Sequence, residues 1–282
     1  MKVGIIGLGL IGGSLGLAMR SRSHYVLGIS RHQETCAVAC AQGITDEAST
    51  DFTLLTKASV IFICTPIGAI IPTVKQLKPI LSPNTILTDV GSVKTPIVEA
   101  ITPLWSNFIG GHPMTGTAQQ GIEAAQQDLF TGTKYVLTPT ENTPVEAQKT
   151  LTEIIQDLDT ELITCSPETH DQAVAWISHL PVFVSSSLIA SCLQETDADV
   201  ITLAQKLASS GFRDTSRVGG GNPELGVMMA KYNQKAVLRS LRIYRQQLDV
   251  IIRFIEEENW EQVEMMLGET KEARSLFINR PL

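Results

Sequence analysis

The feature that most constrains this fold is a glycine motif close to the N-terminus. The run KVGIIG predicts a short buried strand, and a helical pattern begins directly afterwards at Leu10. Between them, Gly7, Gly9 and Gly12 have the spacing GxGxxG. The first glycine permits a tight turn, the second lets the backbone approach a pyrophosphate, and the third lets the helix pack closely on the strand. The motif predicts a dinucleotide-binding βαβ unit; a glycine-rich turn without a ligand is the alternative.

The start of the following helix adds a second argument for a bound phosphate. The N–H groups of its first turn have no acceptor inside the helix, and the helix dipole favours negative charge there. We therefore expect the cofactor to be bound by Gly7, Gly9, Leu10, Ile11 and Gly12.

The end of the next strand bears on which cofactor is bound. Chains that bind NAD usually place Asp or Glu about 20 residues beyond the motif, where it bonds the ribose hydroxyls. Here the strand YVLGI is followed by Ser30, Arg31 and His32. A carboxylate would repel a 2′-phosphate, whereas a hydroxyl beside a guanidinium binds one. The sequence predicts NADP, with a solvent-exposed loop arginine as the alternative.

Alternating patterns extend this unit into a domain. Apolar β-rich runs recur at SVIFIC, TILTD, NFIGG, KYVLT and TELIT, with helical stretches between them, so we expect a mostly parallel sheet covered on both faces. From Ser166 on, the pattern is helical only. The prediction is an α/β fold with a Rossmann-type domain over residues 1–165 and an all-α domain over residues 166–282.

The second domain carries a long apolar segment. Residues 172–194 contain no Asp, Glu, Lys or Arg, and their length is compatible with a membrane span. His179, Pro181 and several serines interrupt the segment. We therefore expect a buried helix at the centre of a domain and no membrane contact.

A second apolar feature lies near the C-terminus. Leu241, Leu248 and Ile255 are seven residues apart and share one helix face. This stripe is long enough to serve a second chain, so we expect a homodimer through the C-terminal helices. Arg245 lies on the same face, either extending into solvent or pairing with an acid such as Asp214 of a second copy.

The composition of the chain limits the classes of molecule that it is expected to bind. A net charge of −7 over 282 residues argues against a broad surface for nucleic acid or anionic membrane, and it leaves room for a small anionic substrate. Five cysteines without CxxC spacing, and no recognisable signal peptide, predict free thiols in the cytoplasm. Cys36 and Cys40 are one helical turn apart, but no further ligand completes a zinc set, so no metal is expected.

Residues at strand ends supply candidate chemistry, because open α/β sheets bind ligands beyond the carboxyl ends of their strands. Thr65 and Pro66 follow one strand, in CTPIGAI, and are expected to line the cofactor. Ser92, in TDVGSVK, and His112, in GGHPM, follow two others and are expected on neighbouring loops facing the nicotinamide. A histidine there takes a proton from a hydroxyl as hydride leaves the same carbon. The alternative is a loop histidine that bonds backbone groups.

Six motifs, taken in order, give a resemblance that covers nearly the whole chain. They are GLGLIGGSLG, DVGSVK, GGHPMTG, SPETHD, SHLP and GFRDTSRV. Together they resemble the prephenate and arogenate dehydrogenase family of tyrosine biosynthesis, and most of all its NADP-dependent arogenate dehydrogenases. The resemblance implies a Rossmann domain, a helical dimerisation domain and oxidative decarboxylation of a cyclohexadienol to an aromatic ring. Prephenate stays open as the alternative substrate, because Val182 and Phe183 follow SHLP where relatives carry polar residues.

The resemblance also implies roles for individual residues. His112 bonds the ring hydroxyl and accepts its proton, and Ser92 supports it. His179 faces the substrate from the helical domain, Arg217 pairs with a substrate carboxylate, and Arg213 in the same motif is a further substrate-binding candidate. Elementary chemistry agrees, because a net-acidic protein needs a local arginine to hold a dicarboxylate or amino-acid substrate. Without the resemblance, a core histidine and a surface arginine are the alternatives for His179 and Arg217.

Two other functions remain as alternatives. A β-hydroxyacid or imine-reducing dehydrogenase shares the glycine motif and would use a lysine such as Lys206 or Lys231, neither of which lies in a convincing motif. A non-catalytic NADP-binding sensor would keep the glycines and Arg31 but would have no use for His112. Turnover of NADP⁺ with arogenate separates these alternatives.

Overall fold

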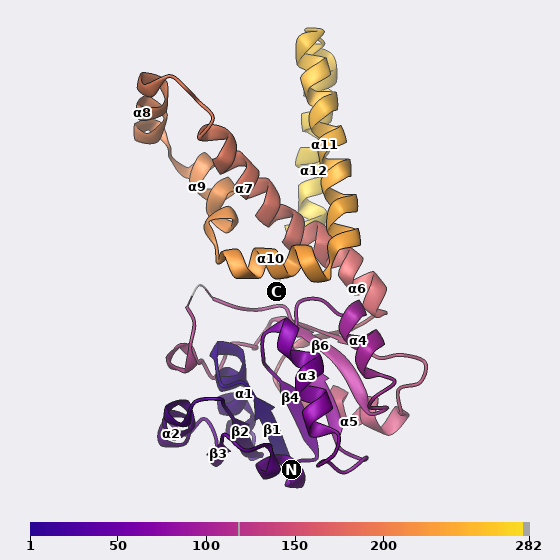
Figure 1. Ribbon diagram of the computed structural model, residues 1–282. Helices are drawn as coiled ribbons and strands as arrows, with labels where there is room; N and C mark the ends of the chain where they lie inside the picture. The colour runs from indigo at the N-terminus through magenta and orange to yellow at the C-terminus, as the bar shows by residue number, and fades with distance from the viewer. Residues whose placement is uncertain (118, 279–282) are drawn as a thin grey trace. The chain divides into compact units, whose positions relative to one another are not determined.

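The computed structural model describes residues 1–117 and 119–278, which form two compact units (Figure 1). The first unit holds residues 1–174 and 221–233, and the remaining described residues form the second. The units are described one at a time.

An eight-stranded sheet forms the centre of the first unit (Figure 1). Its order is β3-β2-β1-β4-β5-β6-β7-β8, and every neighbouring pair is parallel except β6 and β7. The strands are β1 (Lys2–Ile6), β2 (Tyr25–Ile29), β3 (Glu47–Ser49), β4 (Val60–Ile63), β5 (Ile86–Asp89), β6 (Phe108–Pro113), β7 (Lys134–Thr138) and β8 (Glu161–Thr164). The mostly parallel Rossmann-type sheet is confirmed, with its first six positions in the dinucleotide-binding order. Strand β3 was not predicted, because its three residues contain no apolar run.

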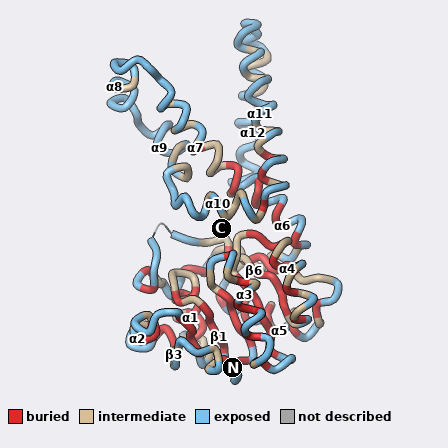
Figure 2. Tube along the Cα trace, viewed as in Figure 1, coloured by how far each residue is buried: buried red, intermediate tan, exposed pale blue. Residues whose placement is uncertain are grey.

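Helices cover both faces of this sheet. The first unit contains α1 (Leu10–Ser21), α2 (Gln33–Ala41), α3 (Ile67–Leu77), α4 (Thr95–Ile101), α5 (Val145–Gln156), α6 (Pro167–Val174) and α10 (Pro223–Tyr232), with short 3-10 turns η1 (Phe52–Lys57) and η2 (Ile122–Ala124). One hydrophobic cluster joins the sheet to α1, α2 and α5, and a second joins it to α3 and α4. Figure 2 shows that the buried residues follow the strands and the inner faces of these helices.

Two helices of the first unit come from beyond residue 165. Helix α6 begins at Pro167, and the Thr169 N–H donates to the Ser166 hydroxyl at 3.1 Å. Helix α10 packs on the second cluster through Met228 and Tyr232. The expected domain boundary near residue 165 stays a prediction; the compact units of the chain are not separated by a single cut at that point.

The second unit is built from helices. Its elements are the π-helical turn η3 (Ala175–His179), α7 (Leu180–Cys192), α8 (Ala198–Leu207), α9 (Ser210–Ser216), the 3-10 turn η4 (Arg217–Gly220), α11 (Gln234–Glu256) and α12 (Trp260–Ile278). Helix α7 packs on α9 and η4, where the Ser185 hydroxyl donates to the Thr215 carbonyl at 2.5 Å. The all-helical pattern predicted from Ser166 is confirmed for the described residues.

The apolar segment 172–194 is helical, but its expected burial was wrong for a single chain. The helical stretch Pro167–Cys192 is long and apolar enough to cross a membrane by length and composition alone, a property that core helices of soluble proteins share. Only 28% of its most apolar window is buried, and Trp176 and Ile177 are 38% and 56% exposed. The helices of one chain cover only part of this surface.

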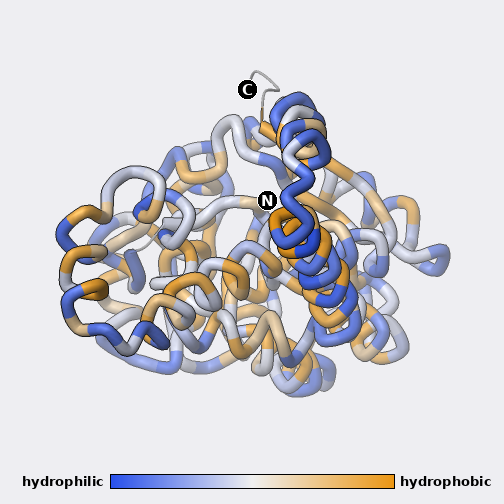
Figure 3. Tube along the Cα trace, turned by 90° about the horizontal axis from the view of Figure 1, so that it is seen from above, coloured by the Kyte–Doolittle hydropathy of each residue, from blue (hydrophilic) through white to orange (hydrophobic). Residues whose placement is uncertain are grey.

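The predicted apolar stripe lies on α11. Four apolar side chains of this helix, two of them from the predicted stripe, are 41–52% exposed in a single chain: Leu238, Leu248, Ile252 and Ile255. Figure 3 shows hydrophobic and hydrophilic residues interspersed along the helices, as in amphipathic helices that pack through one face.

A buried ion pair joins the carboxyl end of β5 to β6. The Asp89 and Lys94 side chains are both fully buried, and the Lys94 ammonium bonds the Asp89 carboxylate. Direct β5–β6 pairing ends at Thr88 and Ile109. Beyond it, the Gly111 N–H donates to Asp89 Oδ1 at 3.1 Å and its carbonyl accepts from Lys94 Nζ at 2.6 Å. The ion pair therefore replaces the backbone hydrogen bonds between β5 and β6 at this point. Burial lowers the pKa of Lys94, and the Asp89 charge opposes that shift.

Removing one partner of this pair should be costly. Lys94→Met leaves the Asp89 charge buried without its counter-ion and the Gly111 carbonyl without its Lys94 donor, so we expect the free energy of unfolding to fall by about 3–5 kcal/mol. Urea denaturation measures it. The matched control is Asp159→Asn in the exposed Arg22–Asp159 pair, where Asp159 is 69% exposed and the loss should be below about 1 kcal/mol. Equal losses in the two variants would contradict the structural role of Lys94.

Candidate active site

The glycine motif forms an open cradle at the start of α1. Gly7 has φ +95°, and a Cβ there would lie 2.7 Å from the Cys64 carbonyl, so only glycine fits. A Cβ on Gly12 would collide with the Gly7 carbonyl. Gly9 differs, because no described atom outside Gly9 and its two chain neighbours lies within 4 Å of its Cβ position. The open space lies at the N-terminus of α1, whose first turn holds Leu10 and Ile11, and this arrangement fits a pyrophosphate.

A buried hydroxyl lies at the neighbouring strand end. Thr65 and Pro66 follow β4, which pairs with β1 where the strand order reverses. Thr65 Oγ1 is buried and has no hydrogen-bond partner among the described residues. An unsatisfied buried hydroxyl costs about 1–3 kcal/mol, so a polar ligand group is expected beside it. The cradle and this hydroxyl both fit a bound dinucleotide.

The residues expected at the adenosine end follow β2 as predicted. Ser30 is buried, and its Oγ accepts from the His32 N–H at 3.3 Å. Arg31 and His32 are exposed. The position at which NAD-binding chains carry a carboxylate thus presents a hydroxyl, a guanidinium and an imidazole.

His112 lies at the carboxyl end of β6 and belongs to a chain of three side chains. Its Nδ1 is 2.8 Å from His170 Nε2, and His170 Nδ1 is 2.8 Å from Asp171 Oδ1. His112 is half-buried, whereas His170 and Asp171 are buried. The two rings meet edge to face, with centroids 5.0 Å apart.

Asp171 is fixed at the N-terminus of α4. Its Oδ1 accepts from the Lys94 N–H at 2.7 Å, and its Oδ2 accepts from the Thr95 N–H at 2.8 Å. Burial alone would raise the pKa of Asp171, but the hydrogen bonds from His170, Lys94 and Thr95 outweigh burial and lower it. Asp171 is therefore an anion at neutral pH. Ser92, half-buried, lies in the loop between β5 and α4 that these bonds hold.

Sequence reasoning missed these supporting residues. Asp89, Lys94, His170 and Asp171 all stand inside motifs that carried the resemblance, DVGSVK and SPETHD. A lysine directly before an apolar helix, and a His–Asp pair near the start of another, were the available signals. Asp89 and Lys94 are five residues apart, but Gly111, which both bond, lies 17 to 22 residues further along. The partners of His170 and Asp171 in other elements lie 58 to 77 residues away, so spacing alone does not pair them.

The substrate-binding candidates lie in the second unit. His179 ends the π-helical turn η3 and is fully buried. Arg213 is on α9, where it bonds Asp214 at 3.2 Å, and Arg217 opens η4 and is exposed. Because α9 and η4 pack on α7, the arginines and His179 belong to one packed set of elements.

Other candidate groups can be placed as well. Lys206 on α8 and Lys231 on α10 are both exposed, and the Lys231 ammonium lies 5.4 Å from the Tyr232 ring centroid. Cys36 is buried and Cys40 exposed. Among residues 1–117 and 119–278, no group of three or more His, Cys, Asp or Glu side chains is placed to hold a metal ion.

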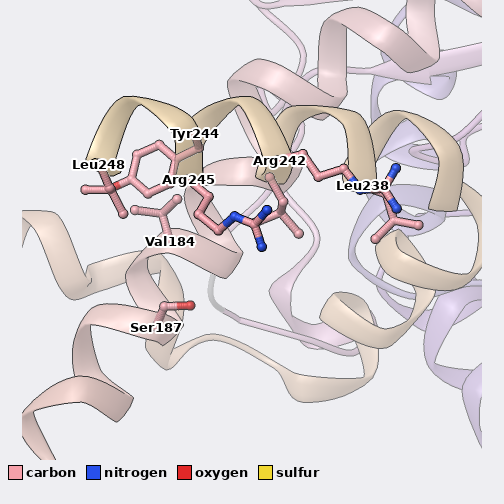
Figure 4. A pocket seen from close by; sticks show the side chains of 8 residues that line it. Val184, Ser187, Leu238, Arg242, Tyr244, Arg245 and Leu248 are labelled. Carbon is pink, nitrogen blue, oxygen red and sulfur yellow. The ribbon is translucent and has the colours of Figure 1, made fainter. Parts of the chain in front are cut away.

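A cavity of about 320 Å³ lies between α7 and α11 of the second unit (Figure 4). Val184 and Ser187 line it from α7, and Arg242, Tyr244 and Arg245 line it from α11. None of the predicted cofactor or substrate residues lines it. The predicted stripe residues Leu241 and Leu248 do, so this cavity belongs to the apolar face of α11.

Comparison with known proteins agrees with this geometry. The protein-family model for the nucleotide-binding domain of prephenate dehydrogenase matches residues 15–164. The family model for the dimerization domain of prephenate dehydrogenase matches residues 166–269. A prephenate dehydrogenase from Lactococcus lactis is 31% identical over 282 residues, covering 97% of this chain and 76% of that protein.

Solved structures agree over nearly the full length. The crystal structure of Synechocystis arogenate dehydrogenase is 54% identical with a TM-score of 0.92, covering 99% of this chain and 100% of that one. Prephenate dehydrogenase from A. aeolicus, in complex with hydroxyphenyl propionate and NAD⁺, is 27% identical with a TM-score of 0.91, covering 97% of each chain. The protein therefore belongs to the prephenate and arogenate dehydrogenase family, nicotinamide-dependent oxidoreductases of tyrosine biosynthesis.

Proposed function

We propose that this protein is an NADP-dependent arogenate dehydrogenase that forms tyrosine in the cytoplasm. The observation that carries the activity is His112, held by His170 and Asp171 at the same sheet edge as the glycine cradle. The 54% identity to an arogenate dehydrogenase supports arogenate as the substrate. Prephenate, giving 4-hydroxyphenylpyruvate, is the second candidate, since relatives of 27–31% identity are prephenate dehydrogenases.

The chain's own residues divide the work of the reaction. The cradle of Gly7, Gly9 and Gly12 and the first turn of α1 hold the pyrophosphate, and Ser30 and Arg31 hold the 2′-phosphate. Bound NADP⁺ supplies the hydride acceptor. His112 takes the proton of the ring hydroxyl while the carbinol carbon is oxidised.

The second unit is proposed to supply the remaining contacts. Arg217 and Arg213 hold the substrate carboxylate, and His179 bonds the substrate. Loss of carbon dioxide then leaves its electron pair in the ring, which becomes aromatic. This step needs no metal, because aromatisation itself accepts the electrons.

We also propose that the protein is a homodimer through the helices of the second unit. The match to a dimerization domain and the exposed apolar side chains of α11 support this assembly. Asp214 already bonds Arg213 within one chain, so a contact between Asp214 and Arg245 of a second copy would need this bond to be exchanged.

Replacing the proposed base should remove turnover while sparing cofactor binding. In His112→Asn the side chain has no basic nitrogen to take the hydroxyl proton, so we expect kcat/KM with arogenate to fall by at least about 10²- to 10⁴-fold. NADPH absorbance measures turnover, and fluorescence titration should give an unchanged Kd for NADPH. A variant that keeps parental turnover would exclude His112 as the base.

The cofactor preference should depend on the residues after β2. Arg31→Ala removes the guanidinium beside the 2′-phosphate and should raise the Kd for NADP⁺ by about 10- to 100-fold, as expected for a charge-assisted bond. Ser30→Asp should lower the NADP⁺ to NAD⁺ preference further by charge repulsion. The Kd for NAD⁺ is the internal control, because NAD⁺ lacks the phosphate. Equal weakening for both cofactors would mean general damage to the site.

The choice of substrate is tested by direct competition. We expect kcat/KM for arogenate to exceed that for prephenate by at least about tenfold, which corresponds to about 1.4 kcal/mol of differential transition-state binding. Both substrates are assayed with NADP⁺ under the same conditions. A preference for prephenate would replace the proposed substrate and leave the family assignment standing, whereas binding of NADP⁺ without turnover of either would favour the non-catalytic sensor.

A further inference from the structure

We infer that His170 and Asp171 are a positioning pair that fixes the tautomer of His112, placing its proton on Nδ1 and its lone pair on Nε2. The catalytic consequence of this inference rests on the proposed function, whereas the tautomer itself is a property of the resting protein.

The assignment follows from counting donors and acceptors along the chain of side chains. Asp171 is an anion, so it only accepts, and His170 must donate to it from Nδ1. A neutral His170 then has an acceptor at Nε2. His112 Nδ1, 2.8 Å away, must therefore be the donor in that bond. A neutral His112 with its proton on Nδ1 carries its lone pair on Nε2.

The backbone around Asp171 fixes which nitrogen of each histidine carries the proton. Asp171 accepts two N–H groups at the start of α4, which donate whatever the histidines do. A protonated carboxyl is a weaker acceptor for both of these bonds, and the helix dipole at this position also favours the anion. The N–H groups of α4 therefore fix the anion of Asp171, the anion fixes the proton of His170, and His170 fixes the proton of His112.

The same order helps the proposed reaction. When His112 Nε2 takes the hydroxyl proton, the ring becomes a cation that keeps its Nδ1–H bond to His170. The Asp171 charge lies two hydrogen bonds away and stabilises that cation. With the opposite tautomer, Nε2 would already carry a hydrogen and would be unable to accept the proton.

A pair of substitutions at His170 separates positioning from packing. His170→Gln keeps an acceptor near the position of Nε2, whereas His170→Met has a similar length and no comparable acceptor. We expect kcat to fall by about 10²-fold or more in His170→Met and by only about tenfold in His170→Gln. The KM for arogenate and the thermal midpoint should be similar in the two variants. Equal kcat values would reduce His170 to a packing residue and overturn the inference.

Asp171→Asn tests the direction of the proton order. Asparagine has one acceptor oxygen and therefore loses one of the two α4 bonds. When this oxygen accepts from Thr95, the NH₂ group takes the place of Oδ1, gives up the Lys94 bond and makes His170 Nδ1 an acceptor. The His170 proton then moves to Nε2, which donates to His112 Nδ1 and reverses the His112 tautomer. We expect kcat to fall by at least about 10²-fold with little change in the Kd for NADPH.

Nitrogen-15 NMR of histidine-labelled protein reads the tautomer without substrate. In the parent, the His112 signal, assigned by its loss in His112→Asn, should show the proton on Nδ1. In Asp171→Asn the His112 proton should be on Nε2. If that variant does not fold, the parent spectrum and the two His170 variants still test the inference. A parent spectrum with the proton on Nε2 overturns the inference. An Nδ1 proton in a protein that oxidises neither arogenate nor prephenate would instead overturn only the proposed function.

Discussion

The geometry at the carboxyl ends of β5 and β6 depends on one buried ion pair. Strands β5 and β6 pair only as far as Thr88 and Ile109, and the ions Asp89 and Lys94 occupy the gap that follows. They bond both the N–H and the carbonyl of Gly111, so the residue directly before His112 is held from two sides. A buried ion pair seldom adds much net stability, but its directional bonds specify one geometry. Here that geometry decides where the proposed base stands.

Lys94 also links this pair to the second support of His112. Its side chain bonds Asp89, while its backbone N–H donates to Asp171. Lys94 therefore supports the His112 imidazole through two sets of contacts, one through the Gly111 backbone and one through Asp171 and His170. Constraints of this kind hold a side chain in a productive orientation before substrate arrives.

The local part of this design could be predicted from the sequence, whereas the long-range part could not. A strand, three glycines and a helix dictate the cradle around Gly9, because each glycine has a steric reason within a few residues. The placement of His112 at a strand end follows from the same alternation of elements. The roles of His170 and Asp171 do not, because their partners come from strand ends and a loop far away in the chain. The burial expected for residues 172–194 failed for a related reason: apolar composition predicts that a surface will be covered, but not by which chain.

The way the chain threads its two units has a consequence for modularity. It passes between them three times, after residues 174, 220 and 233. Asn233, where the last passage begins, donates from its side chain to the Asp171 carbonyl at 2.8 Å, so two segments that return from beyond residue 165 close on each other. A gene fragment that stopped at residue 165 would encode the sheet without α6, α10 or Asp171. Replacing everything beyond residue 165 would therefore exchange not only the helical unit but also two helices of the sheet unit and the anion that bonds His170.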